Sequence, residues 1–170
     1  MNDIYNNSLE HLQDELLLVD LLVHAQVIKF RTLRQNSNPM AGLYLNDTEI
    51  DELLQQSPGY KEWVDNSASV SEQHETLIKL VSNLNQQMQT RLKNSIEKGI
   101  PLKLQEMSRI YSLGSLEMQI FLICLAPEFN SKYNKLYGYL QDDVTKKAPG
   151  VELILDLLCP AFFYSPVPTP

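Results

Sequence analysis

The chain has 170 residues, enough for one domain or two small ones, and 44% of them are apolar, enough for a packed core. That apolar fraction excludes wholesale disorder. The formal net charge is −7, which argues against a general nucleic-acid-binding role, because such proteins carry a clustered basic surface.

The first residues, MNDIYNNSLEHLQDE, are polar and acidic where a secretory signal would be basic and then apolar. The longest apolar stretch, LLLVDLLVHAQVIKF, is interrupted by Asp20, His24 and Gln26, and it is too short and too polar to cross a bilayer. We therefore expect a cytoplasmic protein with no membrane partner.

This stretch belongs to a long helix predicted from about Ser8 to Asn36, with Ser8 as its N-cap and acidic residues in its first turns. Its apolar residues recur at intervals of three and four but cover a wide face, which needs packing partners on two sides. We expect the part not covered within a hairpin to meet the C-terminal helices or a second chain. The possible partner surface comprises Leu16, Leu17, Leu21 and Val23.

A short helix is predicted within NDTEIDELLQQ, and the breaker sequence SPGY ends it. The loop that follows, residues 57–69, contains Trp63. We expect this side chain to pack over a helix rather than to form a binding site.

A second long helix is predicted from about Ser71 to Lys98, and Gly99 ends it. Its apolar stripe is narrow and its other face is rich in Asn and Gln, which favours antiparallel pairing with the first helix. A coiled-coil surface for a partner is the alternative. The stripe Leu77, Leu80, Leu84, Met88 and Leu92 is expected to contact Leu16, Val23, Val27 and Phe30.

After Pro101, four short helices are predicted, within PLKLQEMSRIYSL, SLEMQIFLICLA, NSKYNKLYGYL and GVELILDLLC. The second is apolar on nearly every side around Phe121, which predicts a central place in the core. Cys124 and Cys159 lie among apolar residues, so we expect reduced, buried thiols, with a disulfide or metal pair as the alternative. The end of the chain, PAFFYSPVPTP, predicts a tail or linker.

The sequence contains no recognisable catalytic motif. Its glycines are not spaced to form a phosphate-binding loop followed by Lys-Ser/Thr, so no ATP site is expected in this chain. His11, His24 and His74 have no partner at metal-ligand spacing, and no serine nucleophile elbow is present. We predict no catalytic, cofactor-binding or metal-binding residue.

The adjacent carboxylates Asp142 and Asp143 allow two interpretations. They could hold magnesium at the end of a strand, but the preceding YGYLQ is aromatic and polar, unlike a buried β-branched strand. We favour the alternative, in which they fix a turn or cap a short helix with Thr145. The basic pair Lys146 and Lys147 is either simply solvated or a phosphate contact.

The stretches LAPEFN (residues 125–130) and LYGYLQDDVTKKAPGVELILDLLCP (residues 136–160) carry a resemblance. They are similar to the patterns LAPELD, YGYLQDDVTRR-x-P and LxLLCP in the N-terminal region of a group of bacterial AAA+ ATPases. In that group a helical, winged-helix-like domain precedes the ATPase module. The resemblance is specific over residues 100–160 and looser over the first hundred, where two long helices and the segment GLYLNDTEIDELL support it.

The chain departs from that pattern at several places. Gly114 replaces a Ser at a helix cap, although Glu117 keeps half of a capping box. The residues MQ after Glu117 replace Arg-Asp, and KKA replaces an Arg-rich turn, which weakens bidentate anion binding. The ATPase module is absent from these residues, and its Walker motifs would lie beyond Pro170. QDDVTKK is then a structural signature of the accessory domain, whose motif residues are Gln141, Asp142, Asp143, Thr145 and Pro149.

We therefore expect a mainly α fold. It comprises a long antiparallel helical hairpin with a short helix and loop over residues 1–99, a compact winged-helix-like helical bundle over 100–160 and a Pro-rich tail or linker over 161–170.

The resemblance implies a non-catalytic N-terminal accessory domain of an AAA+ ATPase, which docks a substrate or adaptor or sets ring assembly. ATP and magnesium would bind in the missing C-terminal module. One alternative is a winged-helix DNA-binding module, but its last helix, GVELILDLLC, carries Glu152 and Asp156 and no base. A standalone helical interaction domain is the other. Protein partners or self-association are expected, with no nucleic acid and no small-molecule substrate.

Overall fold

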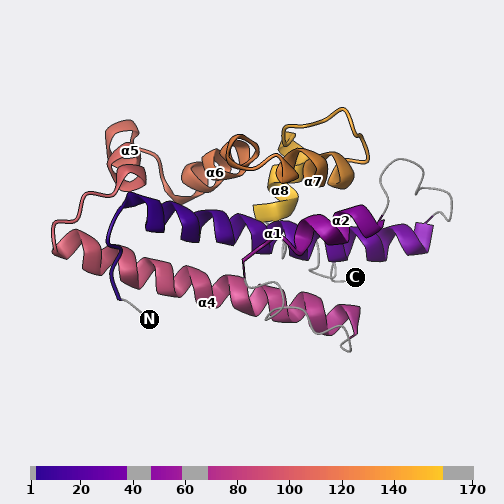
Figure 1. Cartoon of the computed structure of the whole chain (residues 1–170), viewed down its shortest axis with the longest axis horizontal. Helices are drawn as coiled ribbons and strands as arrows, with labels where there is room; N and C mark the ends of the chain where they lie inside the picture. The colour runs from indigo at the N-terminus through magenta and orange to yellow at the C-terminus, as the bar shows by residue number, and fades with distance from the viewer. Residues whose placement is uncertain (1–2, 38–46, 59–68, 159–170) are drawn as a thin grey trace, which may run out of the picture.

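The computed structural model describes residues 3–37, 47–58 and 69–158, and these residues form seven helices and no β-strand. Figure 1 shows α1 in the middle, with α4 antiparallel to it along one side and the C-terminal helices along the other. The predicted mainly α fold with a long antiparallel hairpin is confirmed. The helices are α1 (Ser8–Ser37), α2 (Asp47–Leu54), α4 (Val70–Glu97), α5 (Lys103–Tyr111), α6 (Ser115–Phe129), α7 (Lys132–Leu140) and α8 (Val151–Leu158).

The start of α1 is capped by Asn7 and not, as predicted, by Ser8. Asn7 Oδ1 accepts hydrogen bonds from the backbone N–H groups of Leu9 at 2.9 Å and Glu10 at 3.0 Å. N–H groups in the first turn of a helix have no partner within the helix, so this side chain supplies one. Ser8 Oγ instead donates to the carbonyl of Pro101 at 3.2 Å and accepts from the N–H of Lys103 at 3.0 Å. Ser8 therefore ties the beginning of α1 to the beginning of α5.

Both sides of α1 are covered, but the face that meets α4 differs from the predicted one. Leu21 and Ala25 of α1 form an apolar cluster with Leu77 of α4. Val23 and Val27 were predicted to contact the second long helix, now α4. They lie instead in the larger cluster with the C-terminal helices. Residues two apart in an α-helix point roughly 200° apart, so Leu21 and Val23 face opposite ways. The expectation that a wide apolar face needs partners on two sides is confirmed.

The ends of α4 follow local sequence signals. Ser69 and Glu72 form a capping box, in which Ser69 Oγ accepts from the N–H of Glu72 at 3.3 Å and Glu72 Oε2 accepts from the N–H of Ser69 at 2.8 Å. At the other end Gly99 has φ +71°, a conformation that favours glycine. The predicted end of this helix at Gly99 is confirmed.

The position of α6 is not the central one predicted around Phe121. Leu122, Ile123 and Ala126 are buried, whereas Cys124 is exposed, so the expectation of a buried thiol there is wrong. In Figure 1 α6 lies in the outer layer, above α1. A helix in this layer is covered on one side only, which leaves part of an apolar circumference in solvent.

The short helix α2 is tied to α1 and α7 through Arg31. Arg31 Nη1 donates to Asp51 Oδ1 at 2.7 Å, Nη2 to the carbonyl of Asp47 at 3.0 Å, and Nε to the hydroxyl of Tyr139 at 3.2 Å. Ile50 and Leu54 of α2 are buried in the larger apolar cluster. This anchors α2 over the C-terminal half of α1.

Trp63, Cys159 and the tail 161–170 lie outside the described residues. Across the three described ranges, no helix combines the length and apolarity needed to cross a membrane. The division into residues 1–99 and 100–160 stays a prediction. α1 contacts helices from both parts.

Candidate functional site

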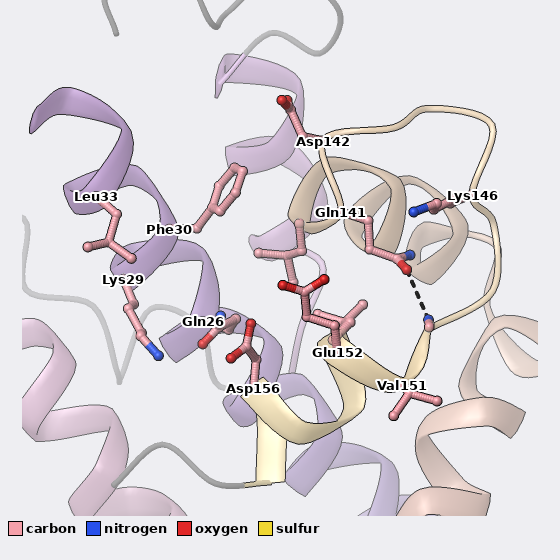
Figure 2. Close-up of a pocket in the computed structure, with 13 residues that line it drawn as sticks. Gln26, Lys29, Phe30, Leu33, Gln141, Asp142, Lys146, Val151, Glu152 and Asp156 are labelled. Carbon is pink, nitrogen blue, oxygen red and sulfur yellow. Dashed lines mark hydrogen bonds between the residues drawn. The ribbon is translucent and has the colours of Figure 1, made fainter. Parts of the chain in front are cut away.

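The turn between α7 and α8 is held by Gln141. Its Nε2 donates to the carbonyls of Tyr137 at 3.1 Å and Ala148 at 3.0 Å, and its Oε1 accepts from the N–H of Gly150 at 2.9 Å. Figure 2 shows the last of these bonds across the turn. One side-chain amide thus joins the end of α7 to the residue that precedes α8. Pro149 lies partly buried within the part of the turn that this amide closes.

Asp142 adopts a left-handed conformation directly after α7. Its φ is +51°, and its N–H donates to the carbonyl of Tyr139 at 3.1 Å. The next N–H, of Asp143, donates to the carbonyl of Gly138 at 2.9 Å, which completes the reversal. The carboxylate of Asp142 lies 3.4 Å from Nη2 of Arg34 on α1.

Asp143 caps the turn through Thr145. Its Oδ1 accepts from the N–H of Thr145 at 2.9 Å and from Thr145 Oγ1 at 2.6 Å, an Asx turn. The hydrogen bonds from the side chain and backbone of Thr145, helped by Lys146, lower the pKa of the Asp143 carboxyl from its usual value. A side chain at Gly138 would meet the carbonyl oxygen of Asp143 at 3.2 Å, so the turn lies tightly against α7. The structure thus places this carboxylate in a turn with Thr145, as favoured from the sequence.

This turn borders a cavity between α1 and the C-terminal helices. The cavity has a volume of about 810 Å³ and is formed by the C-terminal half of α1, the end of α7, the turn and α8 (Figure 2). Its apolar part includes Phe30, Leu140 and Leu153. We call it the α1–α8 cleft. Its charged lining residues are Lys29, Asp142, Lys146, Glu152 and Asp156.

The charges in the α1–α8 cleft are mixed, with two lysines and three carboxylates among the described lining residues. Glu152 and Asp156 are four residues apart and therefore share one face of α8. Figure 2 shows both carboxylates on the side of α8 that faces α1. A lining of apolar residues together with charges of both signs suits a protein segment better than a polyanion.

The predicted site residues divide between this cleft and the core. Gln141, Asp142 and Lys146 line the cleft, whereas Lys147 is exposed and is not among its lining residues. For the possible partner surface the structure gives a correction. Leu21 and Val23 are buried inside the chain, and Leu16 and Leu17 are only partly exposed. The reason is that α4 covers one side of α1 and the C-terminal helices cover the other.

Sequence reasoning missed the contribution of α1 to the cleft. Gln26, Lys29 and Phe30 lie more than a hundred residues before the turn that they face. The polar Gln26 and Lys29 within an otherwise apolar stretch were the available signal, but nothing local relates them to residues 140–156. Where the structure describes the chain, no group of three or more His, Cys, Asp or Glu side chains could hold a metal ion.

The chain matches the sequence model of a known protein family. A sequence model of the family described as "Winged helix domain, variant" matches residues 1–163, which include both long helices and all of the C-terminal helices. No curated protein and no solved structure matches the chain.

Proposed function

Since the chain belongs to the family described as "Winged helix domain, variant", we propose that it is a non-catalytic accessory domain of an AAA+ ATPase. In this role it docks a protein substrate or adaptor, or sets the geometry of ring assembly. ATP and magnesium bind in a separate module outside these 170 residues. The link to an ATPase rests on the resemblance of residues 100–160, since the family description names only the domain.

The α1–α8 cleft is the observation that carries a docking role. The segment that resembles the ATPase group contributes the end of α7, the turn and α8 to its walls. Within that segment Gln141, Asp143 and Thr145 direct their polar groups into the turn itself. They shape the wall of a cleft, which supports a scaffold role for QDDVTKK.

The charge distribution disfavours the alternative of a DNA-binding winged helix. Nucleic-acid binding requires several clustered basic groups, because affinity comes largely from neutralising phosphates. The described lining of the cleft has three carboxylates against two lysines, and α8 presents Glu152 and Asp156. We expect no salt-dependent binding of a duplex at low micromolar protein, measured by fluorescence anisotropy.

The proposal is tested with the product of the complete gene, the same product without residues 1–158, and the 170-residue chain. We expect the complete product to hydrolyse ATP and the 170-residue chain to show no binding of Mg–ATP by calorimetry. Removal of residues 1–158 should change assembly, measured by mass photometry, or the response of hydrolysis to a protein substrate. A complete product without ATPase activity, or micromolar ATP binding by the 170-residue chain, would overturn the proposal.

A surface variant with a matched control tests whether docking takes place in the cleft. Val151 lines the cleft and is 74% exposed, so Val151→Arg introduces charge there without disturbing the core. Val70→Arg, at the exposed start of α4, is the control. We expect only Val151→Arg to impair assembly or substrate response, with both melting temperatures unchanged.

A further inference from the structure

The layer of C-terminal helices carries two groups of exposed apolar side chains, one toward each end of the layer. In Figure 1 α5 lies at one end of this layer, α6 follows it, and α7 and α8 lie toward the other end. The first group lies where α5 passes into α6, and we call it the α5–α6 patch. Its apolar members are Ile110, Tyr111 and Leu116, each of them more than half exposed.

The second group lies on α8, and we call it the α8 patch. Val151 and Leu155 are four residues apart, so they share one face of this helix, and both are at least half exposed. Glu152 and Asp156 form a parallel row beside them, with the same spacing. Single exposed apolar residues are common on protein surfaces, but apolar residues grouped beside one another indicate an interaction surface.

The α5–α6 patch presents an unpaired positive charge. Arg109 is exposed, and no carboxylate of the described residues lies within ion-pair distance of its guanidinium. The other charges nearby are engaged within the chain. Lys103 pairs with Glu106 at 2.8 Å. A side chain at Gly114 would meet Glu117 Oε2 at 2.7 Å, so that carboxylate lies against the start of α6, where backbone N–H groups favour negative charge.

The α8 patch presents the opposite charge. Glu152 and Asp156 are the two charged residues of α8, and in the described part of the chain neither has a basic group within ion-pair distance. In the preceding turn Lys146 lies near Asp143 and helps to lower the pKa of that carboxyl. The patch therefore offers two unpaired carboxylates beside two exposed apolar side chains.

The two patches complement each other. Each combines exposed apolar side chains with unpaired charge, and the charges have opposite signs. Because α6 lies between them in Figure 1, they do not meet within one chain, whereas the α5–α6 patch of one copy can meet the α8 patch of the next. A contact between two different surfaces of identical chains is heterologous, so it repeats from copy to copy and closes into a ring where the rotation between copies allows it.

We propose that the chain associates head to tail with further copies of itself, through the α5–α6 patch of one copy and the α8 patch of the next. Arg109 of one copy meets the carboxylates of Glu152 and Asp156 of the next, and the apolar side chains of the two patches pack together. The occupant of each patch is a second copy because the same chain supplies both complementary surfaces. This deepens the role in ring assembly and rests on the function proposed above.

The test measures self-association of the 170-residue chain without nucleotide, by analytical ultracentrifugation up to about 1 mM protein. We expect the average mass to rise with concentration and to pass that of a dimer. Arg109→Glu and Glu152→Arg should each weaken association by roughly tenfold or more, because each places like charges opposite one another. The double variant should recover much of the association, since it exchanges the two charges across the same contact.

Two exposed residues of α4 provide matched controls. Lys79→Glu and Glu75→Arg make the same changes in net charge away from both patches, so they should leave the association unchanged. All four substituted side chains are exposed, and thermal unfolding of each variant confirms that the fold is intact.

Three results would overturn the proposal: a chain that stays monomeric at about 1 mM, association that neither patch variant weakens, or a mass that levels off at a dimer, which indicates a two-fold symmetric contact. A monomeric chain would leave the ATPase activity of the complete product untouched. A complete product without ATPase activity would leave the measured self-association in place. The failure of this inference and the failure of the proposed function are therefore distinguishable.

Discussion

Lys132 and Asp20 form a buried ion pair between α7 and α1. Lys132 Nζ lies 2.9 Å from Asp20 Oδ1, and the two side chains are 4% and 7% exposed. Ser57 Oγ accepts from Lys132 Nζ at 3.1 Å, and the hydroxyl of Tyr133 donates to Asp20 at 2.7 Å. This network joins the first helix to the segment that resembles the ATPase group, so it bears on how the two halves of the chain are held together.

We predict that breaking this pair destabilises the chain strongly. Lys132→Met leaves the Asp20 carboxylate buried without its cation, a change that costs about 3–5 kcal/mol in comparable pairs. The double variant Asp20→Asn with Lys132→Met should lose less than the sum of the single variants, because it leaves no unpaired charge. Urea unfolding measures all three. The exposed pair Lys103 and Glu106 provides the control: Lys103→Met should cost less than about 1 kcal/mol.

A second prediction concerns left-handed residues. Ser112 follows α5 with φ 54°, and Asp142 follows α7 with φ 51°. Ser112→Gly should stabilise the chain by on the order of 1 kcal/mol, because glycine adopts this conformation without a steric penalty. Asp142→Gly should gain less, since it also removes the carboxylate that lies near Arg34. Thermal unfolding compares the two, and equal gains would show that the contact with Arg34 contributes nothing.

A third prediction concerns the carboxylate of Asp143. Its hydrogen bonds with Thr145 lower its pKa, so they stabilise the fold above the ordinary carboxyl pKa and are lost as pH falls through the lowered value. Asp143→Ala should therefore lower the melting temperature at pH 7 and leave it nearly unchanged at strongly acid pH. A fall of the same size at both values would assign the effect to the backbone instead.

The sequence was sufficient for the two long helices because local signals mark the beginning of each and the end of α4. The capping box at Ser69 and the left-handed Gly99 are properties of a few adjacent residues, and the long helices were placed within a residue or two. The turn at Asp143 was accessible for the same reason, since an Asp two residues before a Thr forms its bonds locally.

The sequence could not show which neighbouring helices each face of α1 contacts. Apolar residues occupy so much of the circumference of α1 that either face could meet α4, and the choice depends on what the C-terminal helices cover. That choice places Leu21 against α4 and Val23 against the C-terminal helices. The exposure of Cys124 follows from the position of α6 in the outer layer. The α1–α8 cleft is also formed by segments far apart in the chain, so no local pattern could predict it.

The corrected packing of the hairpin leads to a fourth prediction. Leu77 is 1% exposed and belongs to the cluster with Leu21 and Ala25, whereas Leu84 is only partly buried at its edge. Leu77→Ala should lower the free energy of unfolding by about 2–5 kcal/mol, the range for a large side chain removed from a core. Leu84→Ala should cost clearly less, measured by urea unfolding. Equal losses would contradict the assignment of Leu77 to the centre of this interface.

The last prediction concerns pH and His24. Burial lowers the pKa of this imidazole from 6.5 to about 4, with Arg31 acting in the same direction and Asp51 and Asp20 opposing it. Between these two values the unfolded chain binds a proton that the folded chain does not, so stability falls as pH decreases from 6.5 to about 4 and this contribution then levels off. The full difference corresponds to about 3 kcal/mol.

The profile is measured by urea unfolding at intervals of pH, and His24→Gln should flatten it over this window. His74→Gln is the matched control, because burial also lowers the pKa of His74 but that side chain is less buried, so the profile should change less. A wild-type profile that is flat between pH 6.5 and 4, or one that His24→Gln leaves unchanged, would show that His24 is not held neutral by the fold.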